Sequence, residues 1–261
     1  METLDLDVCR VLAAKHALPL QFIVKDFCLM DVLSQLAANQ VEFGNIVFKG
    51  GTALNKIYLG GVQRFSEDLD FDVEADLTGA KDVCGKMAGT IRGYKTNGIR
   101  KVGGTYQFEC AYESILGGID HIRVDVAPKK IITDKKTVLA QVSSSYSQKS
   151  VAGVLAYSLE DLVARKLCAL ENRAEGKDLY DTYSSLPICG KMRGALFAML
   201  RSESRKETPA EFIEKALLKV KACDTKKAGN LTNPFIPFQN RPKSWLSLKN
   251  DLAMALEGID T

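Results

Sequence analysis

Three carboxylates, Asp68, Asp70 and Asp72, alternate with apolar residues in the middle of the first half of the chain. Side chains on a β-strand point alternately to its two faces, so a strand over residues 68–73 places all three acids on one face. Neighbouring carboxylates repel each other, and a fold keeps such a row only where a cation lies against it. Hard divalent cations take oxygen ligands, which makes Mg²⁺ bound together with nucleotide phosphates the cation that fits best.

Asp68 and Asp70 are predicted to be metal ligands. A D-x-D pair on a strand points both carboxylates into one site, where they can hold magnesium that bridges the phosphates of a nucleotide. An isolated D-x-D pair is more often a solvated edge strand. Here the alternating apolar residues predict a buried opposite face, and therefore a strand inside a sheet. We expect Asp72 at the exposed end of the strand.

A glycine pair precedes the acids. Residues 45–48 form a short apolar run that predicts a buried strand, and Gly50 and Gly51 follow one residue later. Glycines between a strand and a helix allow backbone N–H groups to approach a phosphate at the helix N-terminus. The spacing is not that of a Walker loop. A glycine pair alone more often forms only a tight turn, and its significance here depends on the acids that follow.

A third carboxylate is expected from a neighbouring strand, as two-metal phosphoryl chemistry requires. In residues 121–126 the polar residues His121, Arg123 and Asp125 alternate with apolar ones, so Asp125 shares a face with Arg123. Gly117-Gly118 predicts a hairpin turn that joins this strand to another over residues 105–112. Taken singly, Asp125 would more often be a surface residue, and its assignment depends on the first motif.

Cations and acids recur in the second half of the chain. Lys166 and Arg173 fall on an otherwise apolar helical stripe, where they either extend to its rim or bind triphosphate oxygens. Lys177 stands one helical turn before Asp181, and a local ion pair is the simplest explanation of that spacing.

The hydrophobic patterns around these motifs predict an α+β chain in two parts. Helices are expected over residues 4–16, 19–38, 52–58 and 76–97, and again after residue 158, with a break over residues 225–241. Residues 128–149 are expected to form a polar connector. The domains predicted are therefore a mixed α/β part over residues 1–150 and a helical part over residues 151–261.

Composition narrows the class of protein. The chain has 261 residues, of which 46% are hydrophobic and 26% charged, as in ordinary globular proteins. Its net charge of +3 means that any nucleic-acid binding must come from local basic surface. No apolar run is long enough to span a bilayer. The cysteines include no C-x-x-C pair, which indicates reduced thiols and a cytoplasmic protein.

Two segments together resemble a known family. Residues 48–54 (F-K-G-G-T-A-L), followed by residues 64–71 (R-F-S-E-D-L-D-F), are similar to the nucleotidyltransferase AbiEii/AbiGii toxin family of the DNA polymerase β-like nucleotidyltransferase superfamily. The resemblance continues through residues 162–170 (L-V-A-R-K-L-C-A-L), residues 172–173 and residues 177–181. It therefore covers roughly residues 47–183.

The resemblance implies a polymerase β-like nucleotidyltransferase core, a small mixed sheet with helices, and a C-terminal helical domain that closes the nucleotide cleft. It implies a transferase of the EC 2.7.7 type with Mg²⁺ or Mn²⁺ as cofactor. An NTP would be the substrate, and RNA, at the tRNA 3′ end, the favoured acceptor. It also implies the toxin of an abortive-infection toxin–antitoxin system, with a cognate antitoxin as partner.

The resemblance also assigns roles to individual residues. The catalytic residues implied are Asp68, Asp70, Asp125, Lys166, Asp178 and Asp181, of which the first three would bind metal. The nucleotide-binding residues implied are Gly50, Gly51, Thr52, Arg64, Ser66, Lys166 and Arg173. Asp125 is chosen by its spacing and its face of the strand.

Two other functions stay open. A nucleotidyltransferase with this core can instead modify a small molecule or a protein hydroxyl. A non-catalytic protein can keep the nucleotide pocket without turnover, although the intact D-x-D pair argues against it because a pure binder has no reason to tolerate that repulsion.

Overall fold

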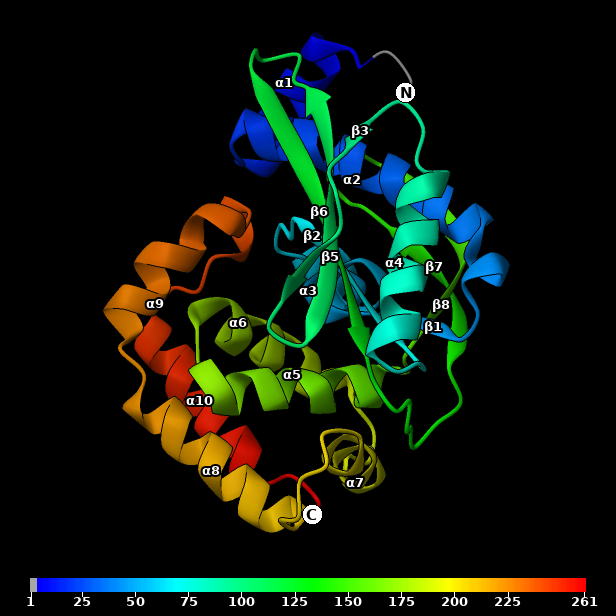
Figure 1. Cartoon of the computed structure of the whole chain (residues 1–261). Coiled ribbons are helices and arrows are strands. Elements are labelled where there is room, and N and C mark those ends of the chain that lie inside the picture. The colour runs from blue at the N-terminus through cyan, green and yellow to red at the C-terminus, as the bar shows by residue number, and fades with distance from the viewer. Residues whose placement is uncertain (1–3) are drawn as a thin grey trace. The chain divides into compact units, whose positions relative to one another are not determined.

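The computed structural model describes residues 4–261, and its strands form one eight-stranded mixed sheet (Figure 1). The strands are β1 (Ile46–Lys49), β2 (Asp68–Val73), β3 (Lys95–Thr96), β4 (Arg100–Val102), β5 (Thr105–Glu113), β6 (Ile119–Pro128), β7 (Val138–Ser143) and β8 (Ser150–Ala156). Their order is β3-β5-β6-β2-β1-β8-β7, and β4 pairs with β5. The acidic strand β2 lies inside this sheet, as predicted, antiparallel to β1 and parallel to β6.

The sheet has the alternation that the acidic motif predicts. Leu69 and Phe71 of β2 are buried, and the residue that pairs with Leu69 on β6, Val124, is buried as well. The ring of Phe48 on β1 lies 5.1 Å from that of Phe71. Burial of this apolar face fixes the register, because a one-residue slip of β2 would turn its carboxylates into the core.

Helices of the same part of the chain pack against the sheet. They are α1 (Leu6–His16), α2 (Leu20–Ala38), α3 (Gly50–Ala53) and α4 (Leu77–Thr90). α2 and α4 contact both β6 and each other. α3 continues directly into a π-helical segment, Leu54–Leu59, so the predicted short helix after the glycine pair begins at Gly50 itself.

Two expectations for this part of the chain are wrong. The helix predicted over residues 76–97 ends at Thr90, because Ile91 is extended and Gly93 has a φ of +78°, and β3 follows. The polar connector predicted over residues 128–149 contains β7. β7 pairs with β8, whose Ala156 pairs with Phe48 of β1. The alternation in β8 is obscured by Gly153, which has a φ of +76°.

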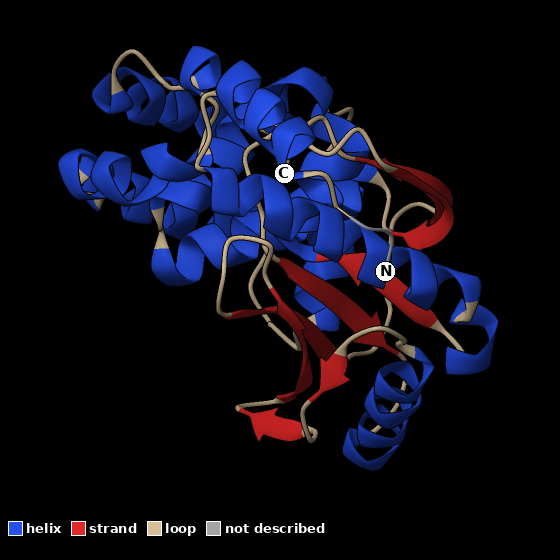
Figure 2. Cartoon of the chain, turned by 90° about the horizontal axis from the view of Figure 1, so that it is seen from above, coloured by secondary structure: helices blue, strands red, loops and turns tan. Residues whose placement is uncertain are grey.

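The chain divides into two compact units by its internal contacts. The first comprises the residues up to Ile131 together with Val138–Ala156, and the second comprises Ile132–Thr137 and Tyr157–Thr261. Among residues 4–261 all strands belong to the first unit and are coloured red in Figure 2. The fold class, a mixed α+β core followed by a helical C-terminal region, is the one predicted.

The second unit is built from helices. They are α5 (Leu159–Arg173), α6 (Gly176–Ser185), α7 (Arg193–Ser202), α8 (Pro209–Ala222), α9 (Thr225–Thr232) and α10 (Trp245–Glu257). The Thr208 side chain and Glu211 form a capping box at the start of α8. The break predicted over residues 225–241 is wrong for α9, which Asp224 caps by accepting hydrogen bonds from two backbone N–H groups. Among the described residues, no helix combines the length and apolar character that crossing a membrane requires.

Candidate active site

Four neighbouring strands each contribute one polar side chain to a row across the sheet. Asp70 of β2 pairs with Lys49 of β1 on one side and with Asp125 of β6 on the other. Asp125 in turn pairs with Gln107 of β5. Directly paired residues lie on the same face of a sheet, so the carboxylates of Asp70 and Asp125 are neighbours. All four side chains line one hollow of about 270 Å³.

Asp68 and Arg123 form the adjoining pair of β2 and β6. The Arg123 Nη2 atom lies 2.6 Å from Asp68 Oδ2, and its Nε atom lies 3.1 Å from Asp125 Oδ2. The side chain of Arg123 is 43% exposed. Asp68, Asp70 and Asp125, named here the carboxylate cluster, therefore lie together on one face, where Arg123 donates to two of them.

The electrostatics of the carboxylate cluster centre on Asp70. Burial raises the pKa of Asp70 to about 6, and the carboxylates of Asp125 and Asp68 add to the rise against the opposing effect of Lys49 and Arg123. Burial also raises the pKa of Asp125, although Arg123 opposes that shift. The two resident cations therefore only partly neutralise the cluster, and an additional positive charge would be bound favourably there.

We expect the substitution Asp70→Asn to stabilise the metal-free protein at neutral pH. The pKa of Asp70 is higher in the folded than in the unfolded protein, so the protonated carboxyl group favours folding. That contribution to stability is fully present below about pH 4 and is lost as the pH rises through about 6. With allowance for partial exposure, the gain in the free energy of unfolding should be about 1–2 kcal/mol at neutral pH, vanishing near pH 4. Urea unfolding in EDTA at both pH values measures it. An equal or lower stability at neutral pH would contradict the assignment of a raised pKa.

Asp72 differs from its prediction. The sequence predicts an exposed strand end, but Asp72 is 2% exposed. Its Oδ1 atom lies 2.5 Å from Nζ of Lys49. The prediction is wrong because β2 is covered at both of its edges by neighbouring strands, and the buried charge is retained through its ion pair with Lys49.

The glycine turn lies directly against Asp70. Gly50 has a φ of +79°, and a Cβ atom at this position would be 2.1 Å from Asp70 Oδ2. A Cβ atom on Gly51 would be 2.7 Å from Arg64 Nη2. Glycine is thus required at residue 50 both by backbone conformation and by the close approach of the backbone to a carboxylate of the cluster.

The substitution Gly50→Ala is therefore expected to cost more stability than Gly44→Ala. Gly44 has a φ of +74°, but no atom lies within 4 Å of the place that a Cβ atom would take, so Gly44→Ala introduces backbone strain alone, of about 1–3 kcal/mol. Gly50→Ala adds displacement of the Asp70 side chain to that strain. Urea unfolding of the two variants gives the difference directly, and equal losses would show that the close approach to Asp70 is unimportant.

Thr52, Arg64 and Ser66 surround the glycine turn. Thr52 Oγ1 donates to the Asp68 carbonyl oxygen at 2.5 Å and lies 2.9 Å from Ser66 Oγ. Arg64 is only 4% exposed, and its Nη1 atom donates to the Phe65 carbonyl oxygen at 2.9 Å. Thr52 is fully buried. These contacts support the turn from within the protein, and a direct contact of Thr52 or Arg64 with nucleotide stays a prediction.

In the second unit, Lys166 of α5 binds two aspartates of α6. Its Nζ atom lies 2.9 Å from Asp178 Oδ1 and 2.7 Å from Asp181 Oδ2, and both carboxylate side chains are 0% exposed. Arg173 also binds Asp178, with its Nε atom 2.8 Å from Oδ2 and its Nη2 atom 3.1 Å from Oδ1. Lys166 is therefore a buried cation held by two carboxylates and does not extend to the rim of the helical stripe.

The charges of this second cluster stabilise one another. Burial alone would raise the pKa of Asp178, but Lys166 and Arg173 outweigh that effect and hold it at about 2. Asp178 is therefore ionised throughout the neutral range. The late basic and acidic motifs of the sequence are brought together, as a cluster of Lys166, Arg173, Asp178 and Asp181 within the second unit.

Comparison with known proteins places the chain in a family. The sequence model described as "Nucleotidyl transferase AbiEii toxin, Type IV TA system" matches residues 31–232, well over half of the chain. The chain belongs to this family. The resemblance seen in the glycine and D-x-D motifs is thereby confirmed, and the protein is a toxin-type nucleotidyltransferase. Membership of the AbiEii family implies an NTP substrate and an antitoxin partner.

Solved structures share the AbiEii fold. The chain is similar to MenT4, a nucleotidyltransferase toxin from Mycobacterium tuberculosis H37Rv, with a TM-score of 0.70 and 21% identity over 99% of this chain and 91% of that chain. It is also similar to JHP933 from Helicobacter pylori, with a TM-score of 0.55 and 17% identity over 92% of each chain. None of the curated proteins compared with the chain matches it. At these identities the structures show the fold.

The chemistry of the carboxylate cluster fits a divalent metal ion. The carboxylate cluster and Asp72 bring four acids together, and the contacts of Lys49 and Arg123 offset only part of their charge, so a divalent cation would add positive charge that the site lacks. Carboxylate oxygens are the ligands that Mg²⁺ and Mn²⁺ prefer. Within residues 4–261 no group of three or more acidic, histidine or cysteine side chains is already arranged around a metal position. In the cluster, Arg123 itself binds Asp68 and Asp125.

Sequence reasoning missed the importance of Lys49 and Arg123. The ion pair of Lys49 with Asp72 depends on the register of β1 against β2, for which the sequence contains no signal. Arg123 carried a signal, because it alternates with Asp125 along the same strand and so had to share its face. The cations that lie against the acidic row therefore include two side chains of the protein itself.

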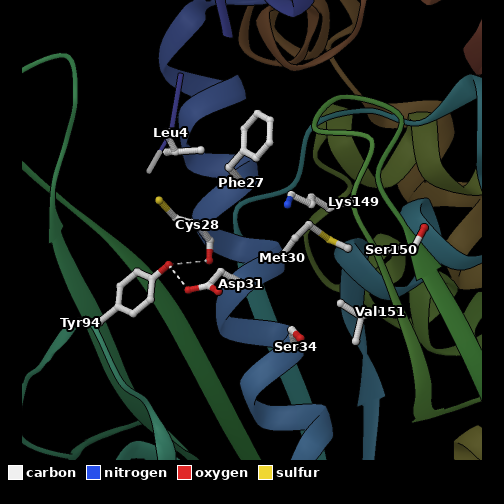
Figure 3. A pocket seen from close by; sticks show the side chains of 10 residues that line it. All are labelled: Leu4, Phe27, Cys28, Met30, Asp31, Ser34, Tyr94, Lys149, Ser150 and Val151. Atoms are coloured by element: carbon white, nitrogen blue, oxygen red, sulfur yellow. Dashed lines mark hydrogen bonds between the residues drawn. The ribbon is translucent and has the colours of Figure 1, made fainter. Parts of the chain in front are cut away.

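Another hollow of the first unit shares no residue with the carboxylate cluster (Figure 3). It has a volume of about 280 Å³ and lies beside α2. The Tyr94 hydroxyl donates to Asp31 Oδ2 at 2.8 Å and contacts the Cys28 carbonyl oxygen at 3.3 Å. Gln35 also donates to Asp31, at 3.2 Å. The acid in this hollow is thus already hydrogen-bonded within the protein, which favours a structural role.

Proposed function

We propose that this AbiEii-type toxin transfers a nucleotide from an NTP to a hydroxyl group of RNA, at the 3′ end of tRNA, in a reaction that depends on Mg²⁺ or Mn²⁺. The observation that supports it best is the pairing of Asp70 with Asp125 across β2 and β6, with Asp68 in the adjoining pair and Gly50 against Asp70. This arrangement combines oxygen ligands for a divalent cation with a backbone turn that can approach a phosphate.

Asp68, Asp70 and Asp125 are the residues that would hold the metal. When bound, a divalent cation supplies positive charge to the phosphate oxygens. Gly50 and Gly51 offer backbone N–H groups to the same phosphates, because the first N–H groups of a helix have no partner within it. Arg123 must release Asp68 and Asp125 for these carboxylates to act as ligands, and its partly exposed side chain leaves it free to turn toward solvent.

The reaction is an in-line displacement at the α-phosphate. The acceptor hydroxyl oxygen forms a bond to the α-phosphorus and loses its proton, the bond to the bridging oxygen breaks, and pyrophosphate leaves. The carboxylate of Asp125, which lines the hollow beside Asp70, is proposed as the acceptor of that proton. Lys166 and Arg173 are proposed as contacts of the triphosphate, and Asp178 and Asp181 as the residues that position Lys166.

Labelled nucleotides test this proposal. The protein is incubated with each of the NTPs, labelled at the α-phosphate, in the presence of Mg²⁺ or Mn²⁺ and purified tRNA, and label in RNA and released pyrophosphate are measured. We expect label on tRNA with the wild type and none with Asp68→Asn. If the label is found on a protein or a small molecule instead, the protein is still a nucleotidyltransferase, but RNA is not its acceptor. A folded protein that consumes no NTP with either ion would contradict the proposal.

A further inference from the structure

The second unit contains a cavity of about 610 Å³ between the ends of its helices. α5 ends beside it at Arg173, and α6 begins beside it with Lys177 in its first turn. Lys219, from the last turn of α8, and Lys227 of α9 also line it. We call this cavity the basic hollow. Its volume is within the range of pockets that bind small organic ligands or a nucleotide.

The basic hollow has an excess of positive charge. Two acids, Glu175 and Asp224, line it together with four cationic residues, Arg173, Lys177, Lys219 and Lys227. Asp224 already accepts hydrogen bonds from the backbone N–H groups of Lys226 and Lys227, at 2.9 Å and 3.0 Å. Lys219 and Lys227 form no ion pair with any carboxylate among residues 4–261. Two lysines from different helices therefore border one cavity with their charges uncompensated, which favours an anionic ligand.

Small and apolar residues also line the basic hollow. Ala174, Ala222 and Ala228 line it, together with Leu231, whose side chain is 62% exposed. A Cβ atom on Gly176 would be 2.2 Å from Thr232 Oγ1 and 2.5 Å from the Ala228 carbonyl oxygen, so the close packing of α6 on α9 fixes the shape of the cavity. A lining that combines apolar residues with cations matches the two parts of a nucleotide, its base with ribose and its phosphate.

We propose that the basic hollow binds unpaired nucleotides of the RNA acceptor, with Lys219 and Lys227 contacting backbone phosphates. This proposal rests on the proposed function, whose acceptor it places. RNA fits better than a second NTP because an NTP is bound as its metal complex, whose metal takes carboxylate ligands. Among the residues that line the cavity only Glu175 and Asp224 carry carboxylates, and Asp224 already caps α9. Phosphodiesters carry a single charge each and need only cations.

The test is RNA binding by the full-length protein without NTP. Fluorescence anisotropy with a labelled tRNA and a labelled single-stranded RNA is measured over a range of salt concentrations. We expect Lys219→Gln/Lys227→Gln to weaken binding of both RNAs about tenfold near 0.1 M salt and to lower the salt slope by roughly 1.4, the value for two phosphate contacts on a single strand. The matched control is Lys226→Gln/Lys243→Gln, which removes two exposed lysines of the same unit that do not line the cavity.

Each outcome decides between the possible ligands. RNA binding by the double variant equal to that of the control would overturn the proposal. A loss of binding to labelled ATP without a loss of RNA binding would also overturn it, because the cavity would then bind free nucleotide. If the lysines determine RNA affinity but the wild type transfers nucleotide to no acceptor, the basic hollow stands and the proposed function fails. If the double variant transfers nucleotide to tRNA normally and its RNA affinity is unchanged, the proposed function stands and the basic hollow is not the RNA site.

Discussion

Replacing Asp70 with Asn is expected to lower the rate of nucleotide transfer by at least about 10³-fold, equivalent to roughly 4 kcal/mol of transition-state stabilisation. Asp70 is the central member of the carboxylate cluster: it pairs with Asp125 of β6, and its carboxylate lies against the glycine turn that follows β1. Its replacement removes both a proposed metal ligand and the charge that makes the cluster attractive to a cation. Pyrophosphate release at saturating NTP and Mg²⁺ measures the effect.

Two features separate this prediction from simple damage to the fold. Asp70→Asn should be inactive and yet more stable than the wild type at neutral pH, since it removes a destabilising charge. Asp82→Asn, which changes an exposed aspartate of α4, is the matched control and should keep both activity and stability. A variant that retains more than about a tenth of wild-type turnover would exclude Asp70 from the chemistry.

The substitution Lys166→Met is expected to lower the free energy of unfolding by about 3–5 kcal/mol, because it leaves buried carboxylates without their cation. Asp178 and Asp181 are both 0% exposed and both bind the Lys166 ammonium group. Asp178 keeps its ion pair with Arg173 in this variant. Urea unfolding at neutral pH, with the slope checked for two-state behaviour, measures the loss.

The triple variant Lys166→Met/Asp178→Asn/Asp181→Asn tests whether the loss of stability comes from the buried carboxylates. It removes the two carboxylate charges together with the lysine, and it should regain most of the lost stability. The folded pKa of Asp178, about 2, is below its unfolded value, so the stability it contributes is present above about pH 4 and is lost as the pH falls toward 2. The deficit of Lys166→Met should therefore shrink over that range. A Lys166→Met variant as stable as the wild type would show that the cluster is not structural.

Period-two patterns gave reliable predictions for β2, β5 and β6. Each of these strands has a buried face, and the apolar residues of β2 that alternate with its acids had to point toward the core. The same argument correctly placed Asp125 on the face shared with Arg123. These predictions succeeded because burial of one face determines the orientation of every residue along a strand.

Tertiary context decided the features that sequence patterns missed. Asp72 looked like the end of a strand, but pairing of β2 on both sides buries it against Lys49. β7 and β8 flank a serine-rich turn, and the weak alternation of β8 contains a left-handed glycine, Gly153. Lys166 was open to two interpretations, and only the fold shows that α6 brings two aspartates to it. Local sequence contains no information on such contacts between elements.

Calorimetric titration of Mn²⁺ into the full-length protein, with a non-hydrolysable NTP present, tests most directly whether the carboxylate cluster binds a divalent cation. At pH 6, near the pKa of Asp70, bound metal should displace a proton from that carboxyl group, so the observed enthalpy should vary with the ionisation enthalpy of the buffer. Asp70→Asn should bind at least about tenfold more weakly and release fewer protons. Equal affinity and equal proton release in the wild type and in Asp70→Asn would contradict the account.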